Sequence, residues 1–146
     1  MKTYVVTISA NFPTTHKRKG EPTNFYPLIL RGLKKHTIRG NYELWKRRFD
    51  KINSGDACLS IRHWDGKPYN STQTELLRFT KDDGIGIEKI EDPTNFVFAQ
   101  IEGKIINWDE VASNDGLYFD DFCEWFKVRS NKPMAIIHFT NFRYSK

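Results

Sequence analysis

The sequence predicts a mixed α+β protein in which short strands form a small β-barrel flanked by short helices. Three observations lead to this prediction. The 146 residues suffice for one domain, spanning residues 1–146, and no repeat or linker divides them. Eleven Phe and four Trp supply apolar surface for a core. Strand-like segments outnumber helix-like segments, and the two kinds alternate along the chain.

Each expected element follows from a local pattern. Alternating apolar and polar residues rich in β-branched side chains predict strands at Thr3–Ser9, Thr37–Arg39, Ala57–Trp64, Gln73–Phe79, Phe96–Ile101, Lys104–Trp108 and Met134–Phe139. Apolar residues at helical spacing, together with capping residues, predict short helices at Pro27–Arg31, Glu43–Ile52, Asp109–Ala112 and Tyr118–Phe126. Asp109 is the expected N-cap of the third helix. Gly, Asp and Asn occupy the turns between these elements.

Charge is distributed unevenly along the chain. Residues 1–62 hold 13 Lys and Arg against 4 Asp and Glu, whereas residues 63–146 hold 10 against 14. This asymmetry indicates a basic face for a polyanion or a nucleotide, unless the two parts neutralise each other across the fold. If nucleic acid is the partner, the candidates for phosphate contacts are Lys17, Arg18, Lys19, Lys46, Arg47 and Arg48.

Several protein classes are not expected. No stretch approaches the roughly 20 apolar residues that span a bilayer, and the N-terminal MKTYVVTISANF lacks the apolar run of a signal peptide. Cys58 and Cys123 lie far apart and form no CxxC pair, which favours reduced thiols and a cytoplasmic location. No His, Cys or carboxylate cluster has metal-ligand spacing, so we expect neither a metal nor another cofactor.

The segment that points to a function is residues 32–39, GLKKHTIR. The preceding helix is expected to end at Gly32, and Thr37 and Arg39 lie on one face of the strand that follows. Lys34 on the connecting turn can swing over that face, so an ammonium, a hydroxyl and a guanidinium can converge. A partly desolvated lysine near another cation has a lowered pKa and can act as a base toward a hydroxyl.

The pattern GxKxxTIR in residues 32–39 resembles the signature of the ASCH domain, a family of the PUA-like superfamily. All five fixed positions match, and a Gly-Asp turn followed by a strand, at residues 55–61, comes after it in the family's order. The resemblance implies a small PUA-like β-barrel with a cleft lined by the signature. It also implies RNA or modified nucleosides as ligands.

Some small ASCH proteins are N4-acetylcytidine amidohydrolases that use a Lys, a Thr and a later carboxylate. The resemblance implies that Lys34 is the base and that Thr37 is the nucleophile or orients a water. Asp115 would hold Lys34 and pass a proton to the leaving amine. Asp115 stands where the family usually has Glu, and the segment Trp64–Gln73 resembles an insertion relative to the compact amidohydrolases.

Further groups are expected to contact the ligand. Arg39 would anchor the ligand or the carboxylate, and backbone N–H groups of the turn Gly32–Lys35 would stabilise an oxyanion. His36 is either a contact to a phosphate or base, or an exposed variable position. Trp64 and Tyr69 flank a turn near the signature strand and are candidates for stacking on a base.

Two functions from other classes stay open at this point. One is a non-catalytic module that binds RNA or nucleotides through the basic N-terminal part, and the other is a ribonuclease. The leading hypothesis is hydrolysis of an amide on a modified nucleoside or a related base.

Overall fold

A computed structural model describes residues 1–146. In chain order the elements are β1 (Lys2–Thr7), α1 (Phe25–Leu30), β2 (His36–Arg39), α2 (Tyr42–Asn53), β3 (Ala57–Trp64), β4 (Gln73–Phe79), the short 3-10 helix η1 (Lys81–Asp83), β5 (Gly86–Ile90), β6 (Ala99–Ile101), β7 (Lys104–Ile106), α3 (Trp108–Asn114), α4 (Phe119–Trp125) and β8 (Met134–His138). The predicted α+β class is confirmed. None of the helices has the length and apolar character that a membrane span requires.

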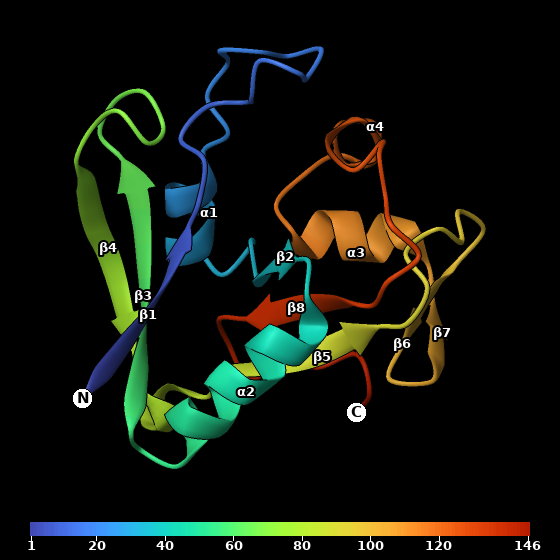
Figure 1. Ribbon diagram of the computed structural model, residues 1–146. Coiled ribbons are helices and arrows are strands. Elements are labelled where there is room, and N and C mark those ends of the chain that lie inside the picture. Colours follow the sequence, from blue (N-terminus) through green and yellow to red (C-terminus); the bar gives the residue numbers. More distant parts are fainter.

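The strands form two sheets rather than one closed ring. One sheet has the order β1-β3-β4, and the other has the order β2-β8-β5-β6-β7. β1 pairs with β3 in parallel, and β2 pairs antiparallel with β8. Neither ladder returns to its first strand, so the structure is two open sheets and not a demonstrated barrel. In Figure 1 the three-stranded sheet stands at the left, and α3 and α4 lie above the five-stranded sheet.

Helix α2 joins the two sheets. It packs against β3 of the first sheet and against β5 and β8 of the second. Its buried side chains are Trp45, Phe49 and Ile52, the stripe that the helical spacing predicts. These residues belong to a single cluster of 25 buried apolar side chains that draws on both sheets. The core is therefore continuous between the sheets even though their hydrogen bonding is not.

Strand β5 is the one strand that the sequence patterns did not predict. It lies at the centre of the five-stranded sheet, between β8 and β6. Its sequence GIEKI begins with Gly86 just after a turn and contains the charged residues Glu88 and Lys89, so it lacks a strong strand pattern. Glu88 is nevertheless only 3% exposed. A buried carboxylate in a central strand needs partners, and the C-terminal segment supplies them.

A second correction concerns the start of α3. The side chain of Asn107 accepts a hydrogen bond from the backbone N–H of Asp109, so Asn107 is the N-cap and not Asp109. The helix consequently begins one residue earlier than expected, at Trp108, and ends two residues later, at Asn114, directly before Asp115. Asn has the same short acceptor as Asp and serves equally well at this position.

Glu88 fastens the C-terminal segment to the central strand. Its Oε1 accepts hydrogen bonds from His138 Nε2 and from the backbone N–H of Tyr144, both at 2.8 Å, and Oε2 accepts one from the N–H of Ser145 at 3.1 Å. Burial raises the pKa of Glu88, but these three bonds outweigh burial and lower the pKa to about 2. The carboxylate is thus ionised at neutral pH and orders the last residues of the chain.

We expect Glu88→Gln to destabilise the protein in a pH-dependent way. At pH 7 the variant should lose about 2–3 kcal/mol, because buried hydrogen bonds to a charged acceptor are weakened or lost. The lowered pKa means that the wild-type advantage is complete above about pH 4.5 and disappears as the pH falls toward 2. Urea denaturation of both proteins across this range measures the difference. A difference that stays constant down to pH 2 would contradict the role of the charge.

Candidate functional site

The turn after α1 directs Lys34 into the protein. Gly32 has a φ of 73°, and its N–H donates to the carbonyl of Ile29 while the N–H of Leu33 donates to that of Leu28. This is the Schellman arrangement that ends a helix at glycine and reverses the chain. The reversal places the Lys34 side chain inside, where it is 1% exposed. Gly32 thus acts through the backbone, as the sequence pattern indicated.

Asp115 is the partner of this buried lysine. Lys34 Nζ donates to the Asp115 backbone carbonyl at 2.6 Å and to Asp115 Oδ1 at 3.3 Å. Nζ also lies 4.1 Å from the centroid of the Phe25 ring. Burial lowers the pKa of Lys34, and the charge of Asp115 opposes this effect. The structure therefore brings together the lysine and the carboxylate that lie 81 residues apart in sequence.

The close fit of Lys34 depends on the residue after Asp115. Gly116 has a φ of 83°, and a Cβ built on it would lie 3.1 Å from Lys34 Cβ. A side chain here would be strained by the backbone and would press on the lysine stem. Glycine at this position lets the backbone carbonyl of Asp115 approach Nζ.

Thr37 and Arg39 lie on the same face of β2, as the strand periodicity predicts. Arg39 Nη1 donates to Thr37 Oγ1 at 2.7 Å and to the Ile38 carbonyl at 2.8 Å, and Nη2 donates to the carbonyl of Thr7. Burial lowers the pKa of Arg39, which Asp115 counteracts, and a guanidinium stays charged even so. Arg39 has no hydrogen bond to the Asp115 carboxylate. It holds the Thr37 hydroxyl and binds β1 instead.

A small cavity joins these groups. Its volume is about 30 Å³, and it is lined by the four polar residues of the site, Lys34, Thr37, Arg39 and Asp115, and by Ile8, Ser9, Phe25, Leu117, Trp125 and Phe126. A space of this size holds about one water molecule. The cavity can therefore receive the reacting atoms of a substrate, but not a nucleoside.

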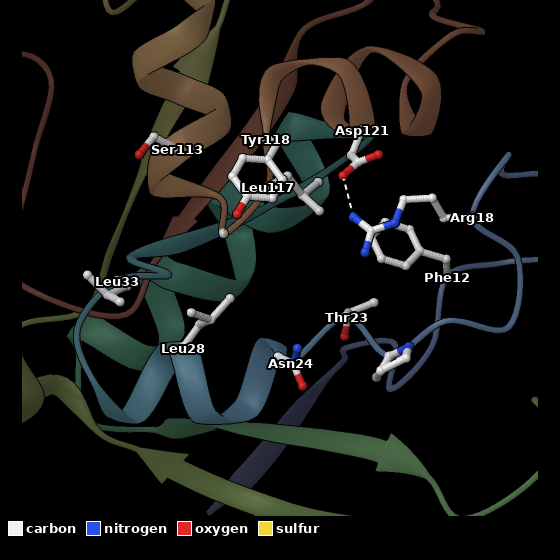
Figure 2. A pocket seen from close by; sticks show the side chains of 12 residues that line it. Phe12, Arg18, Thr23, Asn24, Leu28, Leu33, Ser113, Leu117, Tyr118 and Asp121 are labelled. Carbon is white, nitrogen blue, oxygen red and sulfur yellow. Dashed lines mark hydrogen bonds and ion pairs between the residues drawn. The ribbon is translucent and has the colours of Figure 1, made fainter.

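A larger groove lies beside the cavity. Figure 2 shows its lining, in which Tyr118 and Leu117 face Leu28 and Asn24, and the ion pair of Arg18 with Asp121 closes one end. The volume of the groove is about 410 Å³. Leu117 lines both the groove and the cavity, and Gly116, which packs on Lys34, forms part of the groove wall. Gly116 and Leu117 thus lie between the two spaces.

His36 is not an exposed ligand contact. The side chain is fully buried, and its Nδ1 lies 3.2 Å from Asp115 Oδ1 while its Nε2 lies 2.7 Å from the Tyr144 hydroxyl. Burial lowers the pKa of His36, and Asp115 opposes this shift. His36 points into the protein because it is paired in register with His138 across β2 and β8, on the face that packs against the C-terminal segment.

The expected oxyanion donors are not available. The backbone N–H groups of the turn Gly32–Lys35 all donate to carbonyls: those of Leu33 and Lys34 to Leu28, that of Gly32 to Ile29, and that of Lys35 to Asn114. This prediction was wrong because the helix-ending turn uses its own N–H groups. Donors that remain near the cavity include the guanidinium of Arg39, which has five N–H groups and uses three in the bonds described above.

Trp64 and Tyr69 lie away from this cavity. Their rings contact each other in a tilted orientation at the hairpin between β3 and β4, with centroids 5.1 Å apart and an interplanar angle of 49°. Neither lines the cavity or the groove. Tyr69 has a φ of 64° and is 87% exposed. The expected role of these rings in stacking on a base at the signature is therefore not supported by their position.

The basic residues of the N-terminal part are partly neutralised within the fold. Arg18 pairs with Asp121 at 2.6 Å and with Glu21 at 3.2 Å, and Lys46 pairs with Asp50 at 2.7 Å. Arg48 lies over the ring of Trp45. Arg18–Asp121 is an instance of pairing between the basic and acidic parts of the chain.

Comparison of the chain with protein-family models, with curated proteins and with solved structures finds no match. No group of three or more His, Cys, Asp or Glu side chains is arranged to hold a metal ion.

Sequence reasoning missed the residues that complete the site from other segments. Asn114 at the end of α3 donates to the hydroxyl of Tyr144 near the C-terminus at 3.0 Å, and that hydroxyl also bonds to His36. Phe25 and Leu117 form apolar walls. None of the four belongs to a motif, and only the tertiary fold shows that they meet.

The buried pair should show strong energetic coupling. Asp115→Ala leaves the Lys34 ammonium without its carboxylate and should lower the free energy of unfolding by about 3–5 kcal/mol. In the Lys34→Met background the same change should cost much less, because the charge has gone. Urea denaturation at pH 7 of the two single variants and the double variant gives the coupling.

A matched pair provides the control. Lys46 and Asp50 form an exposed ion pair on α2, and the corresponding variants should show no comparable coupling. If the costs of Lys34→Met and Asp115→Ala simply add, the two side chains do not depend on each other as described.

Proposed function

We propose that the protein hydrolyses an amide on a modified nucleoside or a related base, with N4-acetylcytidine as the model substrate. One observation carries the proposal: the buried Lys34 side chain donates both to the backbone and to the carboxylate of one aspartate, in a cavity that Thr37 also lines. The signature in residues 32–39 supports the same conclusion, and with it a PUA-like arrangement of the strands.

Lys34 acts as the base in this mechanism. A neutral amine has two N–H bonds and one lone pair, and Asp115 accepts from Nζ through its carbonyl and its carboxylate. The lone pair is then free to accept the hydroxyl proton of Thr37. The resting pair holds Lys34 as an ammonium, but burial lowers its pKa, so the ammonium loses a proton to water more readily and forms the neutral amine that reacts. The hydrogen bond from Arg39 to Thr37 Oγ1 stabilises the negative charge that develops on that oxygen.

The reaction then proceeds in two stages. Thr37 Oγ bonds to the acyl carbon, the C–N bond of the amide breaks, and the proton held by Lys34 and Asp115 passes to the departing amine. The Thr37 ester is next attacked by water, which gives its proton to Lys34, and a carboxylic acid leaves as Thr37 recovers its hydroxyl. If Thr37 orients a water instead, the same base acts in one stage. Both routes convert an amide and water into an amine and a carboxylic acid.

The groove next to the cavity suits the rest of the substrate. Its volume of about 410 Å³ lies in the range for small-molecule sites. Tyr118 is 81% exposed and offers a ring face, while Asn24 offers an amide that caps no helix N–H. The charge of Arg18 is offset by Asp121, which favours an uncharged nucleoside over a phosphate. The acyl group would reach Thr37 once the Leu117 side chain turns aside.

The decisive test incubates the protein with N4-acetylcytidine and related N4-acyl cytidines and uses chromatography to measure their conversion to cytidine. The wild-type protein should convert at least one of them. Lys34→Met and Thr37→Val should each lower kcat/KM at least about a hundredfold, because each removes a reacting group. Lys46→Met, on the exposed face of α2, is the matched lysine control and should leave the rate unchanged.

Other results point to the alternatives. RNA binding without conversion of any acyl cytidine favours a binding module, and RNA cleavage that Lys34→Met abolishes favours a ribonuclease. Either result contradicts amide hydrolysis as the function of this site.

The groove can be tested with a pair of tyrosines. Tyr118 lines the groove, whereas Tyr26 lines a neighbouring hollow of about 200 Å³ that shares Phe25 with the cavity and Asn24 with the groove. Tyr118→Ala should raise KM about tenfold, since stacking on a base contributes roughly 1–3 kcal/mol, with kcat less affected. Tyr26→Ala should change KM little. The reverse outcome would place the substrate in the smaller hollow.

A further inference from the structure

We propose that Tyr144 and His36 are positioning residues for Asp115, with the Tyr144 hydroxyl selecting the ring tautomer of His36 that donates to the carboxylate. The proposal rests on the proposed function for its kinetic consequence alone, since its structural part concerns where protons lie in the resting protein. His36 stands at a variable position of the signature, and Tyr144 lies outside it.

The hydrogen-bond donors and acceptors of Asn114, Tyr144, His36 and Asp115 fit together in one way. Asn114 Nδ2 donates to the Tyr144 oxygen at 3.0 Å, so the single hydroxyl proton of Tyr144 remains for His36 Nε2 at 2.7 Å. A neutral His36 that accepts at Nε2 carries its proton on Nδ1. Nδ1 then donates to Asp115 Oδ1 at 3.2 Å. Every group in the chain is buried, so an unmatched donor or acceptor would be costly.

The opposite tautomer disrupts the site. With the proton on Nε2, the lone pair of Nδ1 would face Asp115 Oδ1, and the carboxylate would turn or shift to avoid it. The same oxygen receives the bond from Lys34 Nζ, so a shift in Asp115 moves the base as well. In the arrangement described, Oδ1 is held from two sides and Oδ2 makes no hydrogen bond. Oδ2 is therefore the oxygen left to exchange a proton with the departing amine.

The hydrogen bonds of Glu88 hold Tyr144 in the position from which its hydroxyl reaches His36. The carboxylate binds the backbone N–H groups of Tyr144 and Ser145, and it binds the ring of His138. Burial lowers the pKa of His138 to about 4 despite Glu88, so its Nε2–H is a neutral donor at pH 7. The tyrosine ring is 5% exposed. The C-terminal segment thereby becomes part of the site although it lines none of the cavity.

The tautomer can be measured in the intact wild-type protein. Two-bond ¹H–¹⁵N correlation spectra distinguish a protonated Nδ1 from a protonated Nε2 in each histidine ring. We expect His36 to carry its proton on Nδ1 at pH 7. In Tyr144→Phe the ring should change wholly or partly to the Nε2–H form, because the hydroxyl donor is gone. Tyr42→Phe is the matched control, since the Tyr42 hydroxyl makes no hydrogen bond, and it should leave His36 unchanged.

His36→Asn separates positioning from packing. The amide nitrogen of asparagine can occupy the place of Nδ1 and donate to Asp115 without any choice of tautomer. With N4-acetylcytidine as substrate, Tyr144→Phe alone should lower kcat about tenfold with little change in KM, the scale typical of residues that orient a reacting group. In the His36→Asn background, Tyr144→Phe should have little further effect on kcat. His36→Leu, which donates nothing, should lose activity as the positioning role requires.

The outcomes separate the two proposals. An Nε2–H tautomer in the wild-type protein, or a tautomer that Tyr144→Phe does not alter, overturns the positioning role whether or not the protein is an enzyme. The positioning role is also overturned if Tyr144→Phe lowers kcat by the same factor in the wild-type and His36→Asn backgrounds. If the tautomer behaves as expected but no acyl cytidine is hydrolysed, the positioning of Asp115 stands and amide hydrolysis fails.

Discussion

Burial of the Lys34 amine is the constraint on which the arrangement of the site depends. An ammonium removed from water is costly unless a carboxylate and further acceptors surround it, and Asp115 supplies both a carbonyl and a carboxylate oxygen. To do so, the chain after α3 must turn at Gly116, where a side chain would press on the lysine. The turn at Gly32 must likewise direct the lysine inward. Two glycine turns, far apart in sequence, thus serve one buried charge.

A second buried charge, that of Glu88, is linked to the first through Tyr144. The backbone of this tyrosine binds Glu88, and its hydroxyl binds His36 beside Asp115. His36 and His138 face each other across β2 and β8, with ring centroids 5.5 Å apart. One carboxylate is therefore satisfied largely by backbone N–H groups and the other by side chains. Such connected polar networks in a core hold their members in one geometry, because any displacement leaves a buried group unpaired.

The sequence predicted most elements but only part of the site. The strand at residues 57–64 and its partner at 73–79 were predicted with their exact bounds because their alternation and turn signals agree. β5 was missed because its central position makes its neighbours, not its own pattern, decide its structure. The meeting of Lys34 with Asp115 followed from the motif. The burial of His36 did not, because only the cross-strand register with His138 determines which way that ring points.

The distribution of charge supports the proposal of a small uncharged ligand rather than a nucleic acid at this site. The basic excess in residues 1–62 indicated a polyanion, but the one cation in the groove, Arg18, already pairs with Asp121. A phosphate entering the groove would have to compete with that carboxylate and would lie next to its negative charge. The two cations inside the cavity also have partners already. Lys34 binds Asp115, and Arg39 binds Thr37 and backbone carbonyls. The groups that remain available are the uncharged side chains of Tyr118 and Asn24. They suit an aromatic ring with a polar edge better than they suit a backbone of phosphates.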